Sequence, residues 1–158
     1  MNQPHQGRRS RPGLESLEAR LVLTGDPALF AALTNAGFHW VDYAPSYSSP
    51  NDPYNANPSY ARITADLKAL YQQGFRGLVT YTLQGTYSDI PRIAKSVGFQ
   101  YVVAGVYNVT DASEIAAASS PGVLPYADGF VVGNEGLQDG RYTYDQLSAA
   151  VAQVQQTT

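Results

Sequence analysis

One glutamate in this chain stands where an acid is chemically useful. After residue 18 the sequence contains only two glutamates, Glu114 and Glu135. Glu114 lies three residues after Asp111, the spacing of a capping box at a helix N-terminus. Glu135 instead closes the apolar run 129–133, and apolar surroundings favour the protonated form of a carboxyl group. We therefore interpret Glu135 as a general acid, the alternative being an acid whose oxygens accept the amides of the following loop.

Asn134 and a large number of tyrosines accompany this glutamate. The Asn134 amide is suited to hydrogen-bond a substrate hydroxyl beside the acid. The chain has 12 tyrosines but only 15% charged residues. Rigid amphipathic rings are suited to a sugar-binding or peptide-binding groove, although most tyrosines simply pack in a core.

A repeating strand–helix pattern must position these residues. Apolar, β-rich runs predict four strands at 38–44, 77–83, 101–107 and 129–135. Amphipathic spacing and cap residues predict helices at about 63–71, 88–97, from 111, and 143–155. Four βα units in succession predict a parallel sheet with right-handed crossovers. The continuous apolar strands agree with a sheet that is covered on both faces.

Two α/β architectures are compatible with this pattern. A doubly wound sheet usually has a glycine-rich turn after its first strand, whereas this chain has a long, proline-rich loop there. A TIM barrel fits better, but it needs eight βα units and about 250 residues. The 158 residues of this chain hold four units. We therefore expect an α/β fold of the (β/α) TIM-barrel type, present as a half-barrel over residues 26–158.

The first 25 residues differ in character from the rest. Residues 1–20 carry four arginines and two glutamates, a net charge of +2. Because the whole chain has a net charge of −3, residues 21–158 carry −5. We expect residues 1–25 to be a disordered basic segment. Within it, the run 14–23 resembles the LEPR-type leader of exported bacterial proteins, with Ala19 in place of the proline. That resemblance implies a secreted or cell-surface protein; a cytoplasmic location is the alternative.

Composition excludes several functions. A net charge of −3 argues against a nucleic-acid partner. The chain has no cysteine, and no apolar run approaches the roughly 18 residues of a membrane span. The two histidines, His5 and His39, lack the spacing of metal ligands. We expect neither a metal nor a cofactor.

Several motifs resemble one enzyme family. Residues 132–137, VGNEGL, resemble the VGNE signature of glycoside hydrolase family 17, the β-1,3-glucanases, which are retaining glycosidases with a TIM-barrel fold. Further similar segments occur in the order of the family: WVDYAP at 40–45, ITADL at 63–67 with GFRG at 74–77, VTY at 79–81, and IPRIA at 90–94 with AGVY at 104–107. The resemblance covers about residues 36–156.

The resemblance implies roles for individual residues. Glu135 becomes the general acid/base, and Asn134 binds the sugar hydroxyl next to the scissile bond. Three tyrosines line the catalytic subsite: Tyr43, Tyr81 and Tyr107. From their position in the long first loop, and not from the resemblance, we expect Tyr47 and Tyr54 to stack on sugar rings. Ordinary packing is the alternative for each tyrosine. Val79 departs from the family, which often has arginine at this position.

The resemblance also implies a missing group. A retaining glycosidase needs a second carboxylate about 5–5.5 Å from the acid. In the family this nucleophile lies on strand seven, beyond the four units of this chain, and Asp42 is a poor substitute. We therefore expect a glycosidase-like chain with β-glucan as its ligand that is inactive by itself. The alternatives are a non-catalytic carbohydrate-binding remnant and an interaction module. Exposed half-barrel edges predict self-association.

Overall fold

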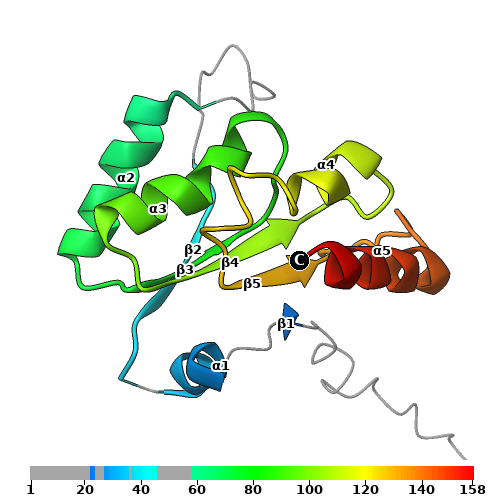
Figure 1. Cartoon of the computed structure of the whole chain (residues 1–158), viewed down its shortest axis with the longest axis horizontal. Helices are drawn as coiled ribbons and strands as arrows, with labels where there is room; N and C mark the ends of the chain where they lie inside the picture. The colour runs from blue at the N-terminus through cyan, green and yellow to red at the C-terminus, as the bar shows by residue number, and fades with distance from the viewer. Residues whose placement is uncertain (1–21, 24–26, 36, 46–57) are drawn as a thin grey trace, which may run out of the picture.

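The structure, a computed structural model, describes residues 22–23, 27–35, 37–45 and 58–158. One sheet carries helices on its faces (Figure 1). The strands are β1 (Val22–Leu23), β2 (Trp40–Tyr43), β3 (Gly77–Thr80), β4 (Tyr101–Val106) and β5 (Gly129–Val132). The helices are α1 (Pro27–Thr34), α2 (Tyr60–Gln72), α3 (Ile90–Val97), α4 (Ala112–Ala117) and α5 (Tyr144–Thr157), with a 3-10 helix η2 (Gly85–Asp89) directly before α3.

Strands β2 to β5 form the parallel sheet that the sequence predicts. The strand order is β1-β5-β4-β3-β2, and each pair from β2 to β5 is parallel. Every parallel strand therefore lies beside the next one in the chain, with a helix in the connection. The α/β arrangement is confirmed. Strands β3 and β5 are shorter than predicted, because they end at Thr80 and Val132. Tyr81 and Glu135 consequently lie in the loops that follow these strands.

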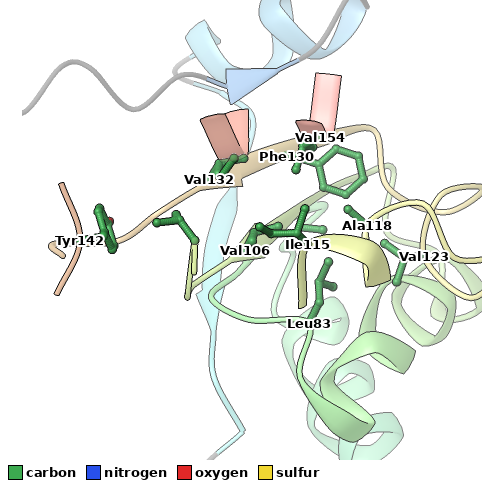
Figure 2. Close-up of a cluster of buried hydrophobic side chains, with 12 residues drawn as sticks. Leu83, Val106, Ile115, Ala118, Val123, Phe130, Val132, Tyr142 and Val154 are labelled. Atoms are coloured by element: carbon green, nitrogen blue, oxygen red, sulfur yellow. The ribbon is translucent and has the colours of Figure 1, made fainter. Parts of the chain in front are cut away.

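Two hydrophobic clusters join the sheet to its helices. One lies between β2–β4 and the pair α2 and α3, and it includes Leu67, Leu78 and Ile93. The other lies between β4–β5 and the pair α4 and α5. Figure 2 shows this second cluster, in which Phe130 and Val132 of β5 lie with Ile115 of α4. The strand residues of both clusters point to the same face of the sheet. Because a shift of one residue would turn them to the opposite face, their burial fixes the register of the strands.

The opposite face of β2 meets α1, a helix that the sequence pattern does not predict. Val41 and Tyr43 belong to the cluster under α2 and α3, so the alternating residue Trp40 points to the other face. The Trp40 Nε1 atom donates a hydrogen bond to the Ala32 carbonyl of α1 at 3.1 Å. In Figure 1, α1 accordingly lies on the other side of the sheet from α2 and α3.

Strand β1 differs from the disorder that the sequence predicts for residues 1–25. Val22 and Leu23 pair antiparallel with Val131 and Phe130 of β5. The remaining residues of that segment, 1–21 and 24–25, lie outside the described residues. This short strand therefore occupies the edge of β5 that the four parallel strands leave open.

Cap residues account for several helix boundaries. Thr143 and Gln146 form the reciprocal bonds of a capping box at the start of α5. Gly98 ends α3 in the left-handed conformation, with φ of 118°. Both boundaries agree with the prediction. Helix α3 begins later than the predicted residue 88, because η2 takes up residues 85–89.

Candidate functional site

The residues predicted to do chemistry gather in part at one edge of the sheet. Tyr81 follows β3, Tyr107 follows β4, and Asn134 and Glu135 follow β5. The carboxyl ends of parallel strands lie at the same edge, the usual location of active sites in α/β folds. Tyr81 is 39% exposed and Tyr107 is 37% exposed. The structure therefore places two accessible rings on strands next to the one that leads to Glu135.

Glu135 adopts an unusual backbone conformation. Its φ is 56°, and among the described residues it is the only one other than glycine with positive φ. For an L-residue that region costs roughly 1–2 kcal/mol. Its side chain is exposed, so the apolar surroundings that the sequence predicts for this carboxyl are not found. The position of Glu135 and its strained backbone still mark it as a candidate functional residue, since strain of this kind concentrates at functional sites.

The loop that follows β5 packs on a buried ring. Tyr142 is buried, and its hydroxyl oxygen accepts the Gly136 amide at 3.2 Å. A Cβ atom at position 136 would overlap the Tyr142 ring, so only glycine fits there. The amide of Asp139 donates to the Glu135 carbonyl at 3.0 Å. These contacts give the Glu135 loop, residues 134–142, a defined course.

Arg141 connects this loop to the end of β4. Its Nη2 atom donates to the Asn134 carbonyl at 2.5 Å. The guanidinium carbon lies 4.5 Å from the centre of the Tyr107 ring, a cation–π contact. Its Nε atom lies 3.3 Å from Oδ2 of Asp139. Sequence reasoning did not identify Arg141, since the residues that it contacts are brought together only by the fold.

Glu114 has a different role from the one predicted. Its backbone amide and that of Ser113 donate to the Asp111 side chain, which confirms the predicted helix start. The prediction of a full capping box is wrong, however, because the Glu114 side chain does not accept the Asp111 amide. The Glu114 carboxylate is only 1% exposed and turns into the core, while the Asp111 amide donates to the Asn108 carbonyl.

Four donors surround the buried Glu114 carboxylate. Oε1 accepts the Thr82 hydroxyl at 2.6 Å, the Leu83 amide at 3.1 Å and the Tyr107 amide at 2.9 Å. Oε2 accepts the Asn108 amide at 2.9 Å. Buried charge of this kind needs such bonds to be tolerated. Glu114 thus ties together the loops that carry Tyr81 and Tyr107.

The other predicted site residues are placed differently. Tyr43 ends β2 beside Thr80, at the same edge of the sheet as Tyr81. Its ring is buried on the helix-covered face, however, and its hydroxyl donates to Oδ2 of Asp66 in α2 at 3.2 Å. Tyr47 and Tyr54 lie outside the described residues. Asp42 is exposed on β2, three strand spacings from β5, which amounts to roughly 14 Å.

One cavity lies near Glu114. Its volume is about 430 Å³, and its lining includes Gln84, Ser88, Asp111 and Glu114. Hydrogen bonds from Ser113 and from the Glu114 amide lower the pKa of Asp111. Neither Glu135 nor the two exposed tyrosines line this cavity, which lies among the loops that follow β3 and β4.

Comparisons of the chain with protein-family models, curated proteins and solved structures find no match. Within the described part of the chain, no three His, Asp or Glu side chains gather as a metal site would require. No helix in that part is long and apolar enough to cross a bilayer.

Proposed function

We propose that this chain is the N-terminal half of a (β/α)8 glycosidase domain similar to glycoside hydrolase family 17, and that it binds β-1,3-glucan-type polysaccharide at the carboxyl edge of its sheet. The strand order supports the barrel, because β2 to β5 follow one another without the reversal of a doubly wound sheet. A polysaccharide ligand also fits the exported location that the N-terminal segment implies.

The position and conformation of Glu135 carry the proposal. The residue lies three positions after the end of β5 with its side chain exposed and its φ at 56°. Glycine would adopt this conformation without strain. A structure that keeps glutamate there, on a loop fixed by Tyr142 and Arg141, holds a carboxyl group at the edge where barrel enzymes bind substrates.

In this proposal each residue at the edge has a separate task. The Glu135 carboxyl donates a proton to the glycosidic oxygen, and Asn134 binds a hydroxyl of the neighbouring sugar. Tyr81 and Tyr107 present rings to the sugar faces. Glu114 keeps the loops of these tyrosines in place through its four hydrogen bonds.

A retaining reaction needs a second carboxylate about 5–5.5 Å from the acid. Glu114 is unsuited to this task, since both of its oxygens accept hydrogen bonds from the fold. Asp42 is unsuited because roughly 14 Å separates its strand from β5. We therefore assign the nucleophile to neither Glu114 nor Asp42. We expect this chain to bind glucan without cleaving it, which favours a carbohydrate-binding role as the second candidate function.

Affinity electrophoresis in gels that contain laminarin, a β-1,3-glucan, tests the proposal. We expect the chain to be retarded, and retardation to be reduced in Tyr81→Ala and Tyr107→Ala. Tyr144→Ala is the matched control, because Tyr144 on α5 is 72% exposed. Equal mobility with and without laminarin would contradict the proposal. Release of reducing sugar, abolished in Glu135→Gln, would show instead that the chain is an enzyme by itself.

A further inference from the structure

The two peptide units that flank the Cα atom of Glu135 are held by separate partners. The preceding unit is held at the Asn134 carbonyl by the Arg141 guanidinium, at 2.5 Å. The following unit is held at the Glu135 carbonyl by the Asp139 amide, at 3.0 Å. Rotation of the first unit about the N–Cα bond is the φ angle of Glu135. The Arg141 contact therefore acts directly on the strained torsion.

Arg141 is itself fixed at two further points. Its guanidinium lies over the Tyr107 ring, 4.5 Å from the ring centre, and its Nε atom contacts Asp139 at 3.3 Å. Tyr107 in turn donates its amide to the buried Glu114. The side chain of Arg141 thus links the loop after β5 to the end of β4. An arginine is suited to this task because its planar group can hydrogen-bond and cover a ring at once.

We infer that Arg141 is a positioning residue that holds Glu135 in its left-handed conformation and so sets the direction in which the Glu135 carboxyl leaves the sheet edge. The proton-donor role of the Glu135 carboxyl rests on the proposed function. The positioning itself concerns the loop and is measurable without a ligand.

Amide hydrogen exchange of the full chain, followed by NMR, tests the inference. In Arg141→Gln we expect the Asp139 amide to exchange at least about tenfold faster, since the loop loses a charged hydrogen bond. Arg92→Gln is the matched control, because Arg92 also pairs with an aspartate, Asp89, and covers the Tyr60 ring. It should leave the Asp139 amide unchanged. Unchanged exchange in Arg141→Gln would overturn the inference.

A second pair of variants separates positioning from general structural support. Glycine adopts positive φ without strain, so Glu135→Gly removes the need for a residue that holds the conformation. We expect Arg141→Gln to accelerate exchange of the Asp139 amide much less in the Glu135→Gly background than in the native chain. An equal acceleration in both backgrounds would show that Arg141 supports the loop without acting on Glu135, and would overturn the inference.

Binding of laminarin distinguishes this inference from the proposed function. If the native chain binds, we expect Arg141→Gln to weaken retardation in the laminarin gel and Arg92→Gln to leave it unchanged. If the native chain does not bind, the proposed function fails, while the exchange results still decide the positioning role. Binding by the native chain together with unchanged exchange in Arg141→Gln would overturn the positioning role and leave the proposed function standing.

Discussion

The buried carboxylate of Glu114 accepts the backbone amide of Tyr107 at 2.9 Å. Glu114 belongs to α4, and Tyr107 is the first residue after β4, so the bond anchors the start of a loop at the candidate site. The same Oε1 atom accepts the Thr82 hydroxyl from the loop after β3. One acidic side chain therefore determines how the ends of two neighbouring strands lie.

We expect Glu114→Gln to destabilise the fold by about 2–3 kcal/mol. An amide has one acceptor oxygen where the carboxylate has two, so at least one buried donor loses its partner. The midpoint of urea unfolding measures the effect. Glu135→Gln is the control, and because Glu135 is exposed we expect a change within about 0.5 kcal/mol. Equal midpoints for the two variants would contradict the structural role of Glu114.

The positive φ of Glu135 should determine which substitutions the position tolerates. At positive φ, glycine is favoured over alanine by about 1 kcal/mol, because alanine retains the steric conflict of its Cβ atom. We expect Glu135→Gly to be more stable than Glu135→Ala by about that amount in urea unfolding. If alanine is equal to glycine or better, Glu135 does not have the left-handed conformation in solution.

The lowered pKa of Asp111 should make the free energy of unfolding depend on pH. Its pKa is lowered below 3.8, chiefly by the hydrogen bond from the Ser113 side chain, and also by the backbone amides of Glu114 and Ser113. A lowered pKa in the folded state contributes stability that is complete above the unfolded value and is lost as the pH falls through the folded value. We expect this contribution to begin to decrease at about pH 3.8 and to be lost below the pKa of the folded state. Asn also caps helices well but does not titrate, so Asp111→Asn should lose less stability between pH 5 and pH 2 in unfolding measured by circular dichroism. An unchanged loss would contradict the prediction.

The pairing of β1 with β5 should reduce self-association of the chain. Val22 and Leu23 pair with the edge of β5 that is otherwise free of a parallel neighbour. An uncovered strand edge promotes pairing between molecules. We expect a chain that begins at Pro27 to self-associate more strongly in analytical ultracentrifugation than one that begins at Val22. Identical sedimentation of the two chains would show that β1 does not protect this edge.

Local signals in the sequence were enough to predict much of the fold. The apolar runs and the cap residues Thr143 and Gly98 depend on neighbours in the chain, and the structure confirms the elements that they mark. Strand β1 escaped prediction because two residues carry no periodic signal, and their pairing with β5 joins segments about a hundred positions apart.

The candidate site was harder to predict than the fold. The spacing of Glu114 from Asp111 predicts a capping box, yet its carboxylate binds loops that only the tertiary structure brings near. The sequence also gives no sign of positive φ at Glu135, because glycine is the residue type that adopts this conformation readily. The adjacent Gly136 is needed for another reason, since the Tyr142 ring leaves no room for a side chain.

Titration of the chain with a β-1,3-linked gluco-oligosaccharide, followed residue by residue in NMR spectra, shows whether glucan binds at the carboxyl edge of the sheet. We expect saturable shifts of the Tyr81, Tyr107, Asn134 and Glu135 signals, with much smaller shifts for the β-1,4-linked isomer. Absence of shifts at these residues, or shifts confined to the region around Tyr144, would contradict the claim that the carboxyl edge of the sheet is a glucan site.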